Sequence, residues 1–193
     1  MSAESRVAVE MAETAALIER LSRSPLPSQT VALAQAIVTA LNQGGKVFAF
    51  GNGGSAAHAQ HFVAELQGRF KMERAPLAAM VLPTDISSLT AIGNDYSFDD
   101  VFSREIEGLG NPGDVALGIT TSGKSRNVLK AVAAARSQDM KTALLVGGDT
   151  SQLQSADHVL SVPSEHTSQI QECHSVLIHR LCELIETSIF GNA

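Results

Sequence analysis

The chain contains no tryptophan, and aromatic residues make up only 4% of its 193 positions. Lysine and arginine do not cluster anywhere in the sequence, and the formal net charge is -6. Proteins that bind nucleic acid need clustered basic side chains for the phosphates and often use aromatic rings for the bases. The sequence therefore argues against a nucleic-acid partner.

Cysteine is also scarce, with two residues, Cys173 and Cys182, in the C-terminal part of the chain. Because they stand nine residues apart on one expected helix, their side chains point to opposite sides and cannot pair with each other. No apolar run is long enough to span a membrane, and the first residues lack the basic stretch of a signal peptide. We expect reduced thiols, no membrane partner and a cytoplasmic location.

The length and the hydrophobic content of 44% predict one α/β domain. Two helices with periodic apolar stripes are expected first, over 5–22 and 28–43. Short apolar runs then predict strands at 46–50, 77–82, 114–120, 141–147 and 158–162. Helical patterns lie at 54–71, 85–109, 124–138, 150–156 and 166–189. This alternation predicts a five-stranded, doubly wound parallel sheet with additional helices at both ends.

The loop after the third expected strand has the composition of a phosphate site. The sequence TTSGKSRN, residues 120–127, places four hydroxyl groups and a glycine directly ahead of an apolar helix. Free amides at a helix N-terminus and the helix dipole favour an anion there. The same residues also suit an ordinary helix cap, but the carboxyl end of a parallel strand is where ligands bind. The hydroxyl groups belong to Thr120, Thr121, Ser122 and Ser125.

A glycine-rich turn, GNGGS at residues 51–55, follows the first expected strand. It matches neither a P-loop nor a complete dinucleotide-binding fingerprint. Glycine is common in turns of any function, so this turn alone is a weak indication. A second polar turn at the same edge of the sheet favours a shared phosphate site.

Side chains suited to metal binding and proton transfer follow the glycine-rich turn. His61 and Glu65 stand four residues apart and so share one face of the expected helix. An imidazole with a carboxylate suits zinc or a similar divalent ion. Gln171 and His179 are further candidates on the last helix, although roughly 12 Å of helix separates them. Two other histidines are interpreted as hydrogen-bonded structural residues: His58 and His174.

Three stretches together resemble the phosphoheptose isomerases: GNGGSAAHAQHFVAEL, AIGNDYSFDDVFSREIEGLGNPGDVALGITTSGKS and SQIQECHSVLIHRLCELIE. The resemblance implies a flavodoxin-like SIS domain that converts sedoheptulose 7-phosphate to D-glycero-D-manno-heptose 7-phosphate. It implies one zinc ion per subunit and a homotetramer with active sites at subunit interfaces. Residues 1–44 would then form a helical pair used in oligomerisation, and residues 45–193 the α/β core with its closing helix.

The resemblance also implies roles for individual residues. Acid–base catalysis through an enediol intermediate falls to Glu65 and His179, with the carbon that each one faces left open. The implied zinc ligands are His61, Glu65, Gln171 and His179. The implied substrate and phosphate contacts are Asn52, Gly53, Ser55, Asn94, Asp95, Thr120, Thr121, Ser122, Ser125 and Gln171.

Departures from the common family pattern include His58, where an aspartate is frequent, and the pair Ser168 and Gln169. Three other functions remain open: a non-catalytic tetramer that binds a replication initiator, a phosphosugar sensor joined to a DNA-binding domain, and an isomerase of another sugar phosphate. The non-catalytic branch lacks the acid–base residues that this chain retains at Glu65 and His179. The expected elements leave no stretch for a DNA-binding domain, so we expect an isomerase.

Overall fold

The computed structural model describes residues 1–148, 153 and 156–191. It begins with two helices, α1 (Ala3–Ser22) and α2 (Leu26–Asn42). The side chain of Ser2 accepts a hydrogen bond from the backbone N–H of Ser5 and so caps α1. A proline in the first turn of α2, Pro27, suits a position whose N–H has no partner within the helix. The proline, together with Pro25 just before α2, accounts for the expected break between the helices.

Five parallel strands form one sheet in the order β2-β1-β3-β4-β5. This order is that of flavodoxin-like folds, in which the chain reverses its direction of travel across the sheet between β1 and β3. Both faces are covered, so nearly all of the residues in the three central strands are buried. The strands are β1 (Val47–Gly51), β2 (Ala79–Leu82), β3 (Val115–Thr120), β4 (Lys141–Gly147) and β5 (His158–Val162). The predicted sheet and its fold class are confirmed.

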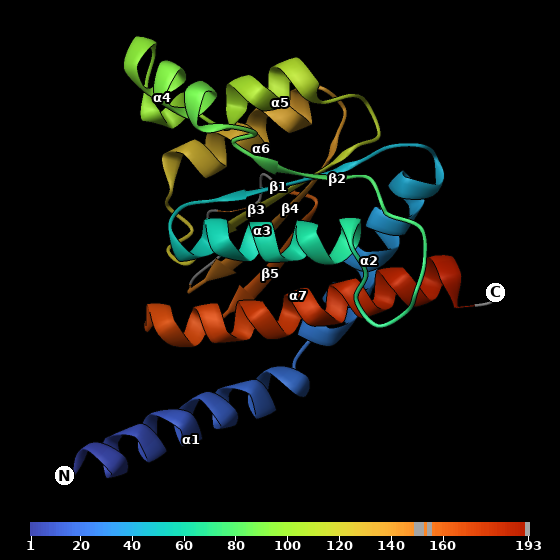
Figure 1. Cartoon of the computed structure of the whole chain (residues 1–193). Helices are drawn as coiled ribbons and strands as arrows, with labels where there is room; N and C mark the ends of the chain where they lie inside the picture. Colours follow the sequence, from blue (N-terminus) through green and yellow to red (C-terminus); the bar gives the residue numbers. More distant parts are fainter. Residues whose placement is uncertain (149–152, 154–155, 192–193) are drawn as a thin grey trace.

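Helices lie on both sides of this sheet (Figure 1). α2, α3 and α7 cover one face and share an apolar core with the side chains of that face. α5 and α6 cover the other, with α4 and the 3-10 turn η1 beside them. The bounds of these elements are α3 (Gly54–Gln67), α4 (Ile86–Asp95), η1 (Phe98–Asp100), α5 (Ser103–Leu109), α6 (Arg126–Ser137) and α7 (Thr167–Phe190).

The helix predicted over 85–109 is wrong as a single element, because the chain forms α4, η1 and α5 there. α4 ends at Asp95, and Ser97 then accepts a hydrogen bond from the N–H of Asp99, which starts the 3-10 turn. α3 is also shorter than predicted, since it ends before Gly68. The short helix predicted over 150–156 falls mostly outside the described residues.

Both cysteines are free and buried in α7, as expected for thiols that do not pair. Burial, with Glu172 nearby, raises the pKa of Cys173 to about 11. Burial, with Glu65 and Glu186 nearby, raises the pKa of Cys182 to about 12. Neither thiol therefore has the lowered pKa of a reactive cysteine. Within the described ranges, no helix has the length and apolar character needed to cross a bilayer.

The first helix stands apart from this core. α1 extends away from the sheet in Figure 1, and only Leu17 and Leu21 of its residues are buried. Val7 and Met11 lie one turn apart on it and are 58% and 69% exposed. An amphipathic helix whose apolar side chains face solvent has a surface available for another chain.

Candidate active site

The two predicted loops meet at the carboxyl ends of β1 and β3, next to each other in the sheet. The side-chain amides of Asn52 and Asn127 donate to each other's oxygen, both at 2.9 Å. The oxygen of Asn127 also accepts from the N–H of Val128 in the first turn of α6. This pair of amides joins the two loops into one polar surface.

Hydroxyl groups line the loop after β3. Thr120 is buried, and its Oγ1 lies 3.0 Å from Oγ of Ser125 and 3.5 Å from Oγ of Ser122. Ser122 is exposed, Thr121 is half-buried, and Oγ of Ser122 accepts from the N–H of Lys124. Although Ser125 is the N-cap residue of α6, its side chain makes no capping hydrogen bond. The first amides of α6 therefore keep their capacity to bind an anion, which favours the phosphate interpretation over the ordinary cap.

The glycine-rich turn after β1 has a backbone that other residues adopt with difficulty. A Cβ on Gly51 would lie 2.7 Å from the carbonyl oxygen of Ile119, so glycine allows the close approach of this turn to β3. Gly53 has φ 55° and ψ -122°, a conformation that favours glycine. No side chain caps the start of α3, and the buried Ser55 lies in its first turn. A second uncapped helix N-terminus thus faces the same edge of the sheet.

α3 and α7 run side by side in the same direction from this edge (Figure 1). A residue of α3 meets a residue of α7 at three successive points along the two helices. The amide of Gln171 lies against Gly54, where a Cβ would come within 2.2 Å of Nε2. His58 lies 2.9 Å from Ser175 Oγ, and the next pair is formed by His61 and His179. From Gly54 to His61 the rise of α3 is roughly 10 Å.

The third pair forms a polar cluster with Glu65. Nε2 of His61 lies 3.2 Å from Nε2 of His179 and 3.2 Å from Oε1 of Glu65. The side chains of His61 and Glu65 are 45% and 27% exposed, so the cluster is open to solvent on this chain. The ring of Phe70 stacks on His179, with centroids 5.6 Å apart and planes at 25°. Two imidazoles and a carboxylate at hydrogen-bond distance suit proton transfer.

Two imidazoles and one carboxylate are also donors that zinc prefers, so the chemistry of the set fits this ion. The described residues contain no ready-made group of three or more His, Cys, Asp or Glu at metal-binding spacing. Each donor approaches His61, but the three do not close around one point. The predicted zinc ligation therefore stays a prediction.

Three predicted site residues belong neither to the two loops nor to this cluster. Gln171 lies beside the glycine-rich turn, two turns of α7 before His179. Asn94 donates to the carboxylate of Asp95 at 2.8 Å, and both side chains are exposed at the end of α4. Within the described residues, no hydrogen bond joins the side chains of Asn94 and Asp95 to the two loops. Substrate contact by these residues also stays a prediction.

The sequence interpretation missed two residues of the site. Asn127, which pairs with Asn52, ends the quoted hydroxyl-rich stretch, so its place in the loop was the available signal. Phe70 lies after the helix that carries Glu65, and nothing in the local pattern indicates that its ring meets His179. The contact joins positions far apart in the chain.

A fully buried histidine, His174, lies beside His58, in agreement with its interpretation as a structural residue. Nε2 of His174 lies 3.3 Å from the carbonyl oxygen of Val146, and its buried Nδ1 finds no hydrogen-bond partner within the described residues. Burial lowers the pKa of His174 to about 4, against a small opposing effect of the Val146 hydrogen bond and with some help from His58. Burial and the neighbouring His61 also lower the pKa of His58.

We expect this histidine to make the fold sensitive to acid. Above its ordinary pKa of 6.5, His174 is neutral in both folded and unfolded chains; below it, only the unfolded chain binds the proton readily. Stability is therefore lost as the pH falls from 6.5 toward 4, by about 3 kcal/mol from this residue. Urea unfolding between pH 7.5 and 4 should show a shallower loss in His174→Gln. The exposed His166→Gln is the control, and equal slopes for all three proteins would contradict the prediction.

Comparison with known proteins identifies the family. A family model described as the SIS domain matches residues 11–147. The phosphoheptose isomerase of Neisseria gonorrhoeae is 47% identical over 188 residues, which cover 95% of each chain. That of Aquifex aeolicus is 52% identical over 162 residues, 83% of this chain and 85% of the relative.

Solved structures agree with these relatives. The phosphoheptose isomerase from Neisseria gonorrhoeae superposes with a TM-score of 0.89 at 42% identity, covering 96% of this chain and 100% of that one. The one from Francisella tularensis gives 0.91 at 36% identity, covering 97% and 100%. The sequence comparison and the structural comparison both extend over nearly the whole chain and indicate the same family. The chain therefore belongs to the SIS domain family and, within it, to the phosphoheptose isomerases, which makes it an isomerase of sugar phosphates.

Proposed function

We propose that this isomerase converts sedoheptulose 7-phosphate to D-glycero-D-manno-heptose 7-phosphate in the cytoplasm. The observation that carries the proposal is the distance between two features along α3. Uncapped helix starts and hydroxyl groups lie at one end, and the cluster of His61, Glu65 and His179 lies roughly 10 Å further on. A sugar phosphate has the same two ends, an anion and, at the far end, the carbons that react.

The phosphate end does no chemistry, but its binding orients the rest of the substrate. Amides at the starts of α3 and α6 donate to it, together with the hydroxyl groups of Thr120 and Ser125. Asn52 and Asn127 keep the two loops in register. Binding energy from this remote group lowers the barrier by holding the reacting carbons against the acid–base residues.

At the other end, an aldose–ketose conversion moves one proton between carbons and another between oxygens. We assign the carbon-bound proton to the carboxylate of Glu65 and the oxygen-linked proton to the imidazole of His179. His61 lies within 3.2 Å of both groups and so brings the carboxylate and the imidazole together where α3 and α7 meet. The enediol that results is a reasonable intermediate because both groups return their protons without leaving the site.

Zinc is proposed as the cofactor, held by His61, Glu65 and His179, whose donor types suit this ion. When bound, it supplies a Lewis acid that polarises the substrate carbonyl. Gln171, which lies beside Gly54, stays a predicted fourth ligand.

Zinc is expected to raise the melting temperature of the wild-type protein, because an ion that binds only the folded chain stabilises it. The rise should disappear in His61→Ala, and a chelator should lower turnover until zinc is added back. His166→Ala, a change of an exposed histidine, should keep the rise. A wild-type melting temperature that does not respond to zinc would contradict the proposed cofactor.

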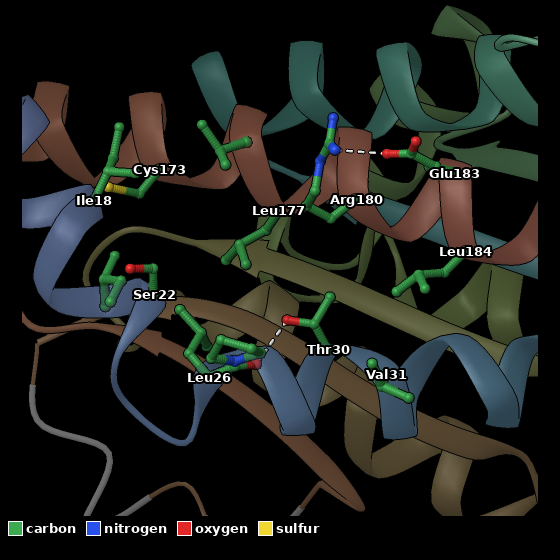
Figure 2. Close-up of a pocket in the computed structure, with 13 residues that line it drawn as sticks. Ile18, Ser22, Leu26, Thr30, Val31, Cys173, Leu177, Arg180, Glu183 and Leu184 are labelled. Atoms are coloured by element: carbon green, nitrogen blue, oxygen red, sulfur yellow. Dashed lines mark hydrogen bonds and ion pairs between the residues drawn. The ribbon is translucent and has the colours of Figure 1, made fainter.

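A homotetramer is proposed as the working assembly. An apolar pocket of about 410 Å³ lies where α1 and α2 meet α7, lined by Leu21, Leu26 and Leu177 among others (Figure 2). α1 beside it exposes Val7 and Met11. A second chain that covers the pocket and these side chains would remove this apolar surface from water.

Met11→Asp is expected to break this assembly, since it places a charge on the exposed apolar face of α1. Light scattering should give the mass of four chains for the wild type and a smaller one for the variant. Glu4→Gln in the first turn of α1 serves as a control that removes a charge. A wild-type protein that is monomeric at micromolar concentration would overturn the proposed tetramer.

The substrate is tested by an isomerase assay of the purified protein. Sedoheptulose 7-phosphate is compared with hexose and pentose phosphates at equal concentrations, and formation of the aldose is followed. The proposal predicts the highest kcat/KM for the heptose phosphate. Faster turnover of a shorter sugar phosphate would instead favour an isomerase of that sugar, and binding without turnover of any of them would favour the non-catalytic tetramer.

A further inference from the structure

A buried ion pair lies at the far end of α3, beyond the acid–base residues. Nε of Arg74 lies 3.1 Å from Oε1 of Glu186, and each side chain is 2% exposed. Arg74 belongs to the connection between α3 and β2, residues 68–78, which loops across α7 (Figure 1). Glu186 belongs to the last turns of α7. Breaking a buried pair of this kind is costly, so its geometry constrains everything bonded to it.

The carboxylate of Glu186 binds the connecting segment through its backbone. It accepts hydrogen bonds from the N–H groups of Phe70, Lys71 and Met72, at 2.8 to 3.1 Å, in addition to the one from Arg74. Burial opposes ionisation, but these donors outweigh it and hold the pKa of Glu186 below its usual range. Three consecutive residues are thereby held against α7.

The guanidinium of Arg74 binds the C-terminal end of α3. Nη2 donates to the carbonyl oxygen of Glu65 at 2.6 Å, and Nη1 donates to that of Leu66 at 2.6 Å. Further bonds reach the carbonyl oxygens of Gly68 and Ala75. The last carbonyls of a helix have no partner within it, so this cation fixes the turn that carries the Glu65 side chain.

The other end of the same arrangement reaches His179. The N–H of Phe70 donates to Glu186, and the ring of Phe70 stacks on the His179 imidazole at 5.6 Å. A stacked ring restricts rotation of the imidazole about its side-chain bonds. The Arg74–Glu186 ion pair therefore has two connections to the acid–base residues. Arg74 binds the backbone of Glu65, and Glu186 binds the backbone of Phe70, whose ring stacks on His179.

We propose that Arg74 and Glu186 are positioning residues, and that with Phe70 they hold the carboxylate of Glu65 and the imidazole of His179 in register for proton transfer. The inference rests on the proposed roles of Glu65 and His179. None of the three residues needs to touch the substrate, since they act through the backbone of α3 and through the stacked ring.

Loss of the Arg74–Glu186 ion pair is expected to change kcat and not KM. Loss of the arrangement displaces the acid–base groups but leaves the phosphate loops unchanged, because these lie about three turns of α3 away from Glu65. Misplacement by about 1 Å lowers the rate by roughly 100-fold when the reacting geometry is strict, so kcat should fall by about 10- to 100-fold. KM for the sugar phosphate should stay within about twofold.

The test compares matched variants of the full-length protein in the assembly in which it is purified. Phe70→Leu removes the ring and Phe70→Tyr keeps it; Phe70 is half-buried, so both should fold. Glu186→Gln removes the charge that holds the segment, and Glu73→Gln makes the same change on the connection at a side chain that is 92% exposed. The expected result is a lower kcat with unchanged KM for Phe70→Leu and Glu186→Gln, and wild-type values for Phe70→Tyr and Glu73→Gln.

A readout independent of turnover is the NMR spectrum of protein with isotope-labelled histidine. Phe70→Leu should move the His179 ring signal and Phe70→Tyr should leave it near its wild-type position. Wild-type kcat and an unmoved His179 signal in Phe70→Leu would overturn the positioning role even if Glu186→Gln failed to fold. If instead Glu65→Gln and His179→Ala retained turnover, the proposed acid–base roles of these two residues would be wrong, which separates the two outcomes.

Discussion

Glu65→Gln is expected to lower kcat by roughly 1,000-fold, the largest effect of any single substitution in this chain, because a positioned general base supplies about that factor. The amide has nearly the shape of the carboxylate but does not take up a proton. Its partner His61, at 3.2 Å, loses an anionic neighbour without losing a contact. His179→Ala should cost about 100-fold by the same argument.

The substrate should still bind to these variants. The phosphate loops lie at the other end of α3, so KM is expected to change by no more than about threefold. Steady-state kinetics with sedoheptulose 7-phosphate measures both constants. Glu107→Gln, on the opposite side of the sheet in α5, is the matched control and should keep wild-type kinetics. Turnover above one-tenth of the wild-type rate in Glu65→Gln would remove this residue from the mechanism.

Ser122→Asp is expected to have the opposite kinetic signature. Ser122 is exposed, so an aspartate fits the fold, but its carboxylate would stand among the hydroxyl groups that we propose bind the phosphate. Repulsion between the two anions at about 5.5 Å costs about 3 kcal/mol at the effective dielectric of a protein surface, or roughly 100-fold in affinity. KM should rise by that factor, with kcat at saturation much less affected.

Two controls isolate the charge. Ser122→Ala removes one hydroxyl group without adding an anion and should raise KM by less than about tenfold. Ser137→Asp adds the same charge at the other end of α6, where the residue is exposed, and should leave KM unchanged. If Ser122→Asp bound the sugar phosphate as tightly as the wild type, the phosphate would have to lie elsewhere.

The fold class was readable from the sequence because it depends on local patterns. Each strand is a short apolar run bounded by turns, and the repetition of strand and helix leaves only a parallel, doubly wound sheet. The break inside 85–109 was missed, because it depends on the serine cap at Ser97, a signal of one residue within a helical pattern. The helical pattern averaged over 85–109 hid the signal of this single capping side chain.

Part of the site was also predictable from the sequence. Polar turns after β1 and β3 must meet, because the carboxyl ends of parallel strands lie at one edge of the sheet. His61 and Glu65 share a helix face through their spacing alone, and the structure places them 3.2 Å apart. Both conclusions follow from the geometry of a single element or of one sheet.

Contacts between distant segments were decided only by the tertiary structure. His179 meets His61 across 118 residues because α7 packs in parallel against α3, an arrangement set by the shared apolar core. The same packing brings Gln171 to Gly54 and away from the histidines. In the sequence, Arg74 and Glu186 look like two ordinary surface charges. Only the fold brings them together as a buried ion pair. The sequence thus determined which residue types stand at each strand end and helix face, whereas the packing of α3, α7 and their connection decided which of them meet.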